Sequence, residues 1–160
     1  MAPAGLAAAN RLLQLLADDE ELLEQLGEVP VAVIEKGKTC GAHNLSGAVM
    51  KPGPLKSLFP DEDLTGLPAV RWVNEKDEVW WLTEKGTRPM PGPTPPNFQN
   101  EGNWVTSISQ LCRWMAEKAE ESGAYILTET AAAKLLVQNG AVQGVVTGDK
   151  GRGKEGQELG

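Results

Sequence analysis

The sequence predicts an α/β fold in which helices alternate with strands of a partly parallel sheet. An apolar helical stripe near the amino end leads into the continuous β-branched run PVAVIE, and a second amphipathic helix leads into the apolar run AYILTE. A continuous apolar run is typical of a strand buried on both faces, as in parallel sheets. A segment rich in turn-forming residues separates these two helix–strand pairs. We therefore expect part of a doubly wound domain that lacks its first strand and carries an antiparallel β excursion.

The composition excludes several classes of protein. The 160 residues suffice for one domain, and 41% hydrophobic with 23% charged residues is typical of a globular chain. The net charge of −7 argues against binding to nucleic acid, which needs clustered Lys and Arg. No apolar run reaches the length of a membrane span, and no targeting leader is evident. Cys40 and Cys112 lack C-x-x-C spacing, which predicts two buried thiols rather than a disulfide framework or a zinc site.

The first helix is expected to begin near Pro3, because proline suits a first helical turn. The segment DDEELLEQLGE adds a further turn or two that Gly27 ends, and the strand PVAVIE follows. Residues 37–68 hold many turn formers and are interpreted as loop with at most one short helix. Residues 70–73 and 78–83 are expected to pair as a hairpin across NEKD. The proline-rich run RPMPGPTPPNFQNEGN then crosses a surface in extended form.

A second helix is the clearest local prediction. Ser107-Ile-Ser-Gln110 fits a capping box at its start, one apolar stripe follows, and Gly123 ends it. AYILTE is expected to be a strand, and Asn139-Gly140 predicts a hairpin between AAAKLLVQ and AVQGVVTG. The glycine-rich tail, residues 149–160, is expected to be loose.

The opening MAPAGLAAAN matches the second half of the turn G-x-G-x-x-G, which seats a dinucleotide pyrophosphate at the start of a helix. Met1 and Ala2 stand where that motif would begin, so only Gly5 remains of its glycines. The same residues also fit an ordinary alanine-rich helix start.

Glu35 ends the first buried strand, where a carboxylate can accept hydrogen bonds from ribose hydroxyls. It follows Gly5 by 35 − 5 = 30 residues, more than the usual spacing of about 20, and the acidic segment accounts for the excess. A solvated surface charge is the alternative for a strand-end Glu. The helix start, the strand and the glycine-rich loop together favour ribose binding.

The loop CGAHNLSGAV combines small residues with the only histidine, His43. Its backbone N–H groups and small side chains suit close approach to a flat cofactor. No second histidine is available for a catalytic triad, and a Cys40–His43 nucleophile pair would lack an orienting third group.

The segments PAGLAAANRL, VPVAVIEKGKTCGAHNLSGAVMKP, LTEKGTRPMPGPTPPNFQNEGNWV, LCRWMAEKAEESGA and GVVTGDKGRGKEGQE stand in the order found in the electron transfer flavoprotein–ubiquinone oxidoreductase family, which the chain resembles along nearly its whole length. The resemblance implies a glutathione-reductase-like, Rossmann-type FAD-binding fold that is interrupted by a quinone-binding domain. It also implies a [4Fe–4S] module, but Cys40 and Cys112 do not match the cluster positions. Relative to the family, the chain resembles an amino-terminal portion shortened at both ends, through truncation or a misplaced start, although Ala2 could also be a genuine substitution.

The resemblance also implies roles for particular residues. Ala4 and Gly5 would face the FAD pyrophosphate, Glu35 the adenosine ribose, and Lys36 the adenine side. The stretch from pyrophosphate to isoalloxazine would lie near His43, Ser46 and Gly47, and the start of the next helix would bring Ser107 to the cofactor.

By the same resemblance, residues 1–49 and 103–160 would form two parts of the FAD-binding domain, and residues 50–102 the quinone-side excursion. Trp80 and Trp81 would point to opposite faces of a strand, one packing inside and one meeting lipid or a partner; two half-buried sheet tryptophans are the alternative. The implied activity passes electrons from reduced electron transfer flavoprotein to ubiquinone. It would take place at the surface of the bacterial cytoplasmic membrane or the mitochondrial inner membrane. A related flavin reductase of the geranylgeranyl reductase type, or a truncated polypeptide without cofactor or catalysis, are the other hypotheses.

Overall fold

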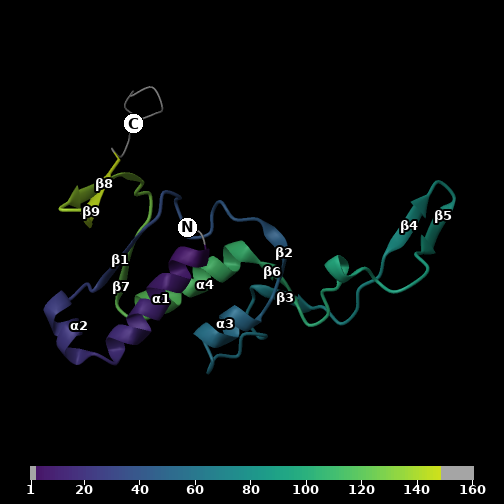
Figure 1. Ribbon diagram of the computed structural model, residues 1–160, viewed down its shortest axis with the longest axis horizontal. Helices are drawn as coiled ribbons and strands as arrows, with labels where there is room; N and C mark the ends of the chain where they lie inside the picture. The colour runs from purple at the N-terminus through teal and green to yellow at the C-terminus, as the bar shows by residue number, and fades with distance from the viewer. Residues whose placement is uncertain (1–2, 149–160) are drawn as a thin grey trace. The chain divides into compact units, whose positions relative to one another are not determined.

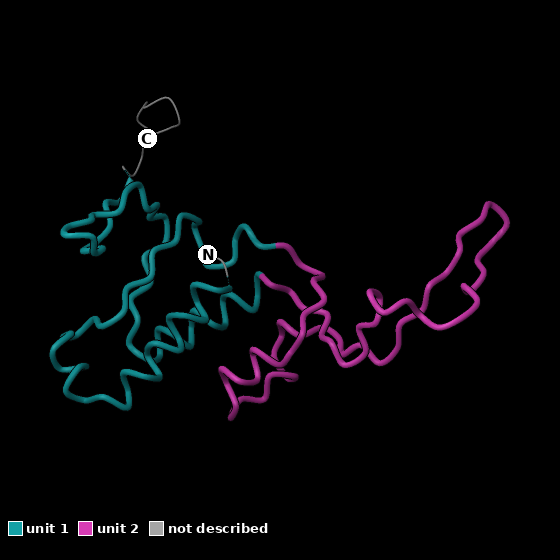
Figure 2. The backbone as a smooth tube through the Cα atoms, in the orientation of Figure 1, with its two compact units in different colours: residues 1–44, 109–160 teal, residues 45–108 magenta. Residues whose placement is uncertain are grey.

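The computed structural model describes residues 3–148 (Figure 1). This part of the chain divides into two compact units, coloured separately in Figure 2. Unit 1 is discontinuous, since it takes residues from 1–44 and 109–160, and unit 2 comprises residues 45–108. Each unit is a mixture of helices and strands, which confirms the α/β class.

Unit 1 begins with two helices and a short strand. Helix α1 spans Pro3–Ala17, α2 spans Glu20–Leu26, and strand β1 spans Val31–Ile34. The side chain of Asp19 accepts a hydrogen bond from the N–H of Leu22 and so caps α2. Gly27 ends that helix with φ +79°, as predicted.

The parallel arrangement expected in unit 1 is present. Helix α4 spans Ile108–Glu121 and leads into strand β7, Ala124–Leu127, which pairs in parallel with β1. The register aligns Val31 with Ala124 and Ile34 with Leu127. Gly123, at φ +95°, ends α4 as predicted. The long antiparallel segment between β1 and β7 is therefore an insertion into a β–α–β unit.

One hydrophobic cluster holds unit 1 together. It joins residues of α1, α4, β1 and β7, with Val33 packed against it: Ala9, Leu13, Leu16, Val31, Ala119 and Ala124. Both helices therefore cover the same face of the β1–β7 pair. The prediction that β1 is buried on both faces is wrong, because Ala32, on the face of β1 away from the helices, is exposed.

The hairpin predicted near the carboxyl end is confirmed. Strand β8 spans Ala132–Gln138 and β9 spans Ala141–Thr147, and the two pair antiparallel. Asn139 and Gly140 both have positive φ, at +53° and +78°, as a type I′ turn requires. The tail predicted to be loose, residues 149–160, lies outside the described residues.

Unit 2 contains a three-stranded antiparallel sheet. Its strands are β2, Ser46–Met50; β3, Val70–Val73; and β6, Trp104–Ser107, in the order β2-β6-β3. The predicted hairpin between residues 70–73 and 78–83 is wrong. Strand β3 pairs with β6, and strand β4, Trp80–Thr83, pairs instead with β5, Gly86–Pro89. Only two residues, Glu84 and Lys85, connect β4 to β5, so these two strands pair locally and β3 is left to a distant partner.

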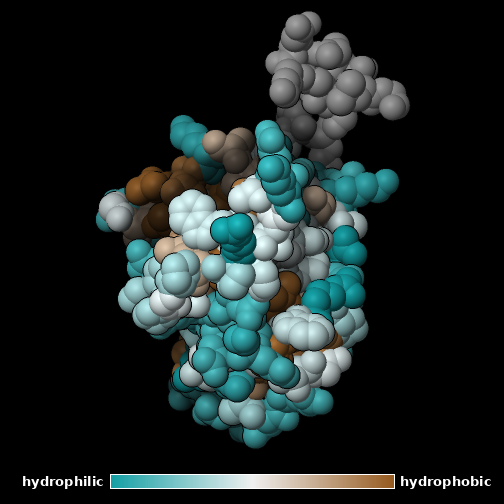
Figure 3. Space-filling view, turned by 90° about the vertical axis from the view of Figure 1, so that its right-hand side faces the viewer, coloured by the Kyte–Doolittle hydropathy of each residue, from teal (hydrophilic) through white to brown (hydrophobic). Residues whose placement is uncertain are grey.

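The segment 37–68 contains more regular structure than the predicted single short helix. That helix is α3, Gly53–Leu58, but β2 precedes it. A 3₁₀ turn, Pro96–Phe98, is the only helical part of the proline-rich run within the described residues. No helix in residues 3–148 is long and apolar enough to cross a membrane. The face drawn in Figure 3 is largely hydrophilic, and hydrophobic residues appear on it in separate patches.

Candidate functional site

Glu35 is held rigidly where β1 ends. Its backbone N–H donates to the carbonyl oxygen of Leu127 and its carbonyl oxygen accepts from the N–H of Thr130, both at 2.8 Å. Its side-chain Oε1 accepts a hydrogen bond from the N–H of Gly37. Only 4% of Glu35 is exposed, so the alternative of a solvated surface charge does not hold. The fold places a fixed carboxylate at the carboxyl end of a parallel strand, which is where open α/β sheets bind ligands.

Gly37 brings Glu35 and His43 together. A Cβ atom at Gly37 would lie 3.0 Å from Oε1 of Glu35 and 3.2 Å from Cε1 of the His43 ring. Such a contact is tighter than side chains ordinarily accept, so the absence of a side chain lets the loop fold over the carboxylate. The sequence pattern alone did not single out Gly37, because its role depends on how closely the loop approaches Glu35 and His43.

The loop after Gly37 is packed against α4. Gly41 has φ +77°, and a Cβ there would collide with the carbonyl oxygen of Ser109 and lie 3.1 Å from Cβ of Cys112. Asn44 donates a hydrogen bond of 3.1 Å from Nδ2 to Sγ of Cys112. The histidine between them, His43, is exposed. The loop is thus fixed at both ends while His43 stays accessible.

The two cysteine thiols, Cys40 and Cys112, are buried. Burial raises the pKa of the Cys40 thiol and also that of the Cys112 thiol. A nucleophilic cysteine needs a lowered pKa. The structure therefore gives no support to a Cys40–His43 nucleophile pair. Within residues 3–148, no group of three or more His, Cys, Asp or Glu side chains is arranged to hold a metal ion.

The other candidate residues of unit 1 are accessible. Ala4 and Gly5 are exposed in the first turn of α1, where backbone N–H groups lack intrahelical partners and suit an anion. This end of α1 lies toward the carboxyl end of β1 (Figure 1). Lys36 is exposed directly after Glu35. Unit 1 also has a cleft of about 660 Å³ beside β7 and α4, lined by polar side chains that include Lys38, Thr39, Arg113, Glu117, Glu120 and Thr128.

The remaining three candidates come together within unit 2. Ser46 opens β2 and pairs with Ser107 at the end of β6, and their hydroxyl oxygens lie 3.2 Å apart. Gly47, at φ +78°, forms the bulge between Ser46 and Ala48. Ser107 directly precedes α4, as predicted for a helix start. The candidate residues are thus divided between the two units, with Ser46, Gly47 and Ser107 in unit 2 and the others in unit 1.

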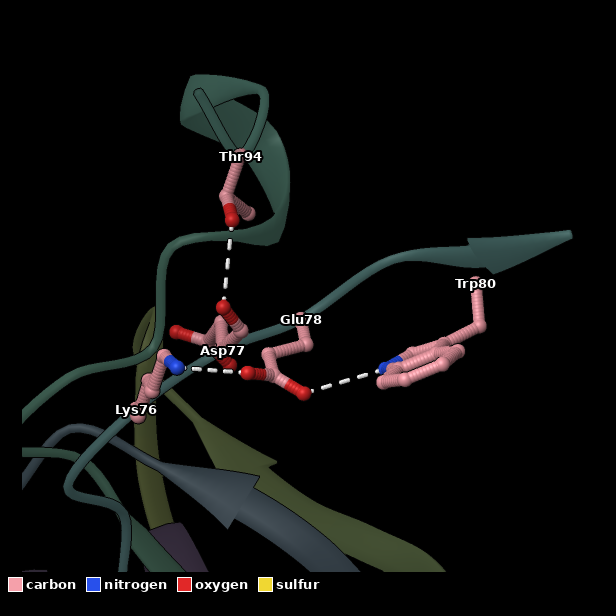
Figure 4. Close-up of polar contacts among 5 residues, drawn as sticks. All are labelled: Lys76, Asp77, Glu78, Trp80 and Thr94. Carbon is pink, nitrogen blue, oxygen red and sulfur yellow. Dashed lines mark hydrogen bonds and ion pairs between the residues drawn. The ribbon is translucent and has the colours of Figure 1, made fainter. Parts of the chain in front are cut away.

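Asp77 fastens the base of the β4–β5 hairpin in unit 2. Its carboxylate accepts hydrogen bonds from Nδ2 of Asn74, at 3.0 Å, and from the N–H of Asn100. Its carbonyl oxygen accepts from the Thr94 hydroxyl at 3.1 Å (Figure 4). One aspartate therefore ties the turn before β4 to the proline-rich run that follows β5.

The tryptophans of β4 lie on this hairpin. Trp80 donates from its ring N–H to the Glu78 carboxylate, which also pairs with Lys76 (Figure 4). The hydrogen bond from Lys76 lowers the pKa of Glu78. Trp80 is 48% and Trp81 60% exposed, so neither ring packs inside, which agrees with the alternative of two half-buried tryptophans on a strand. A two-stranded ribbon has no second layer against which to bury either ring.

A parallel β–α–β unit with a fixed carboxylate at the strand end and an accessible helix amino terminus is typical of dinucleotide-binding domains. No family model matches the sequence. Curated relatives do match it: the electron transfer flavoprotein-ubiquinone oxidoreductase of Pseudomonas aeruginosa is 42% identical over 157 residues, which is 96% of this chain and 27% of that protein. The mitochondrial proteins of that name from Oryza sativa and Rattus norvegicus are 41% and 39% identical, over 98% and 96% of this chain and 25% and 24% of theirs.

The chain belongs to the electron transfer flavoprotein–ubiquinone oxidoreductase family, which confirms the resemblance noted in the sequence. It spans about a quarter of the length of these curated relatives. Among solved structures, a geranylgeranyl bacteriochlorophyll reductase-like protein from Thermoplasma acidophilum is 20% identical, covering 71% of this chain and 27% of that one, with a TM-score of 0.48. That score is too low to support an inference.

Proposed function

We propose that this chain supplies the ADP-binding side of an FAD site and part of a quinone-side structure. The complete activity would be electron transfer from reduced electron transfer flavoprotein to ubiquinone. The names of the curated relatives support that activity, and the chain accounts for about a quarter of their length. The observation that carries the proposal is the buried Glu35 carboxylate at the carboxyl end of β1.

The residues of unit 1 fit the ADP half of FAD. Glu35 would accept hydrogen bonds from the ribose hydroxyls, since its position is fixed through Gly37 and the backbone of β7. The exposed first turn of α1, with Ala4 and Gly5, would donate N–H groups to the pyrophosphate. Lys36 would flank the adenine. Bound FAD supplies the electron chemistry itself, and the protein supplies position and electrostatics.

His43 and the unit 2 residues complete the proposed set. His43, Ser46, Gly47 and Ser107 would serve the stretch of the cofactor between the pyrophosphate and the isoalloxazine. We propose the glutathione-reductase-like fold for the FAD-binding parts of the chain. A [4Fe–4S] cluster needs four thiolates, and this chain has two cysteines, so the ligands of a family cluster would lie outside it.

Residues 50–102 would belong to the quinone side. Ubiquinone is lipophilic, so an enzyme that reduces it must reach a membrane surface. The exposed Trp80, Trp81 and Leu82 of β4 suit a lipophilic partner, because indole rings combine an apolar body with a polar N–H. We place the complete protein at the periphery of the bacterial cytoplasmic or mitochondrial inner membrane.

Titration of the chain with FAD and with FMN tests the proposal. The Glu35→Gln variant keeps the size of the side chain and removes its charge. Loss of one charge-assisted hydrogen bond is expected to weaken FAD by about 10- to 100-fold. FMN has no adenosine ribose, so its affinity should be unchanged. Glu28→Gln, at an exposed position before β1, is the matched control and should leave both affinities unchanged.

Two outcomes would contradict this proposal. Equal losses of FAD and FMN affinity would mean that Glu35 acts through the fold rather than through the ribose. Absence of flavin binding by the unaltered chain would support the alternative, a polypeptide that acts without cofactor. Circular dichroism of each variant separates both outcomes from misfolding.

A further inference from the structure

Helix α2 takes no part in the core of unit 1. Every residue from 17 to 29 is exposed, and none of the seven residues of α2 is buried. Glu35 follows Gly5 by 35 − 5 = 30 residues, whereas a spacing of about 20 is usual in a dinucleotide-binding unit. Helix α2 therefore adds residues that the β–α–β unit does not need, and its side chains are available for another role.

Helix α2 nevertheless has an apolar face. At about 100° per residue, Leu26 and Leu23 lie about 40° and 100° round the helix from Leu22. These three leucines, which we call the leucine face, are 42% (Leu22), 37% (Leu23) and 46% (Leu26) exposed, and Val29 just beyond the helix is also exposed. An amphipathic helix ordinarily buries such a face. Within residues 3–148, nothing buries the leucine face.

Negative charge surrounds the leucine face. Carboxylates lie on the opposite side of α2, before its start and after its end: Asp18, Asp19, Glu20, Glu21, Glu24 and Glu28. Residues 17–29 hold these six acidic side chains and no basic one, so they carry 0 − 6 = −6 of the net charge of −7. Among residues 3–148, no ion pair joins one of these six carboxylates to a lysine or arginine. The charge is therefore available to a partner.

The sign of this charge selects the occupant of the leucine face. A second copy of the chain would bring six more carboxylates against the first six, and like charges oppose such a contact. Nucleic acids and the cytoplasmic leaflet of a membrane are anionic as well. A polypeptide segment with apolar side chains on one face and lysine or arginine around them matches both the leucine face and its surroundings.

We propose that the leucine face of α2 and the carboxylates around it dock a basic amphipathic helix of a partner protein. Apolar contacts anchor one helix on another, and the charges beside the contact set the choice of partner. Helix α2 is only about 10 Å long, so the contact area suits a weak, transient complex rather than a permanent one. This surface goes beyond the proposed flavin site and needs no flavin for its test.

The test uses the full chain and a synthetic helical peptide of leucine and lysine, whose leucines recur at spacings of three and four and so form one face. Fluorescence anisotropy of the labelled peptide measures its affinity. A second peptide has the same composition but its leucines are dispersed round the helix. We expect the first peptide to bind at least tenfold more tightly than the second. Raising the salt from about 0.05 M to about 0.5 M should weaken the binding of the first peptide.

Two pairs of substitutions in the chain test the apolar contact. The variant Leu22→Gln with Leu26→Gln should weaken the first peptide by about tenfold, because the exposed parts of two leucines no longer become buried. Glutamine retains a high helix propensity. The matched control is Leu12→Gln with Leu15→Gln, two leucines of α1 that are 46% and 51% exposed, and it should leave the affinity unchanged.

A second comparison tests the charges. The variant Glu20→Gln with Glu24→Gln should weaken the first peptide by about fivefold at low salt, since it removes two carboxylates beside the leucine face. Glu75→Gln with Glu84→Gln removes the same charge from exposed positions of unit 2 and should have little effect. Analytical ultracentrifugation of the unaltered chain is run alongside.

Four results would overturn the proposal. They are no binding of the first peptide, equal binding of both peptides, equal losses in a variant of α2 and its matched control, and a dimer of the chain that the Leu22→Gln, Leu26→Gln variant abolishes. The last result would make a second copy the occupant. If a variant of α2 fails to fold by circular dichroism, the two peptides decide the question with the unaltered chain.

Discussion

Replacing Gly41 by alanine should destabilise unit 1 severely, because two separate penalties meet at this position. Its φ of +77° disfavours any residue with a Cβ, by about 1 kcal/mol or somewhat more. The new methyl group would also collide with the carbonyl oxygen of Ser109, and it would lie 3.0 Å from the Cα of that residue and 3.1 Å from Cβ of Cys112. The colliding atoms are helix backbone and cannot rotate away, and such overpacking costs about 1–3 kcal/mol. We expect a total loss of about 3 kcal/mol.

Gly123→Ala separates the two penalties. Gly123 has φ +95° at the end of the same helix, and a Cβ there would meet no atom within 4 Å. This variant should lose only the conformational part, about 1 kcal/mol. Urea unfolding followed by far-ultraviolet circular dichroism reports on α1 and α4. With a slope of about 2 kcal/mol/M, the two midpoints should differ by about 1 M. Coincident midpoints would refute the close approach of this loop to α4.

Three further predictions concern other contacts. Asn10→Ala should lower the free energy of unfolding by about 2–3 kcal/mol, because it removes the buried hydrogen bond to the Met115 carbonyl oxygen and leaves a gap between α1 and α4. Equilibrium unfolding measures this loss. A loss below about 0.5 kcal/mol, which is the usual scatter of surface substitutions, would contradict the prediction. The raised pKa values of Cys40 and Cys112 favour the neutral thiols in the folded chain, so stability present below the ordinary thiol pKa of 9.0 should fall as the pH rises past it. Folded chain should accordingly react slowly with a disulfide reagent at neutral pH and quickly in urea; equal rates would count against burial. Asp77→Ala should free the base of the β4–β5 hairpin and speed its cleavage in limited proteolysis, with an unchanged cleavage rate as the contrary result.

The sequence predicted those elements whose determinants are local. The Asn139-Gly140 turn and the glycine at position 123 specify their own backbone conformations, and α4 follows from an apolar stripe within fourteen residues. The partner of β3 could not be predicted in this way. Strand β3 pairs with β6, which is distant in sequence. No local feature of Val70–Val73 favours β6 as the partner over the nearer β4.

The same distinction between local determinants and contacts of distant segments applies to the candidate site. The position of Glu35 at the end of a strand was evident from the pattern, whereas its burial depends on the loop that folds back through Gly37. The contact between the hydroxyls of Ser46 and Ser107 also depends on a strand pairing across 61 positions. Sequence patterns indicate which residues end a strand, but contacts between distant segments follow from the tertiary packing.

The insertion of unit 2 into unit 1 affects the order in which the chain can fold during its synthesis. Strand β1 ends at Ile34 and its partner begins at Ala124, 124 − 34 = 90 residues later. At about 5–20 residues per second, the ribosome needs about 5 to 18 s to synthesise that stretch. Through this interval the nascent chain exposes both edges of β1 and the whole apolar stripe of α1. Unit 2, whose residues are contiguous, is synthesised completely before β7 and can therefore fold first.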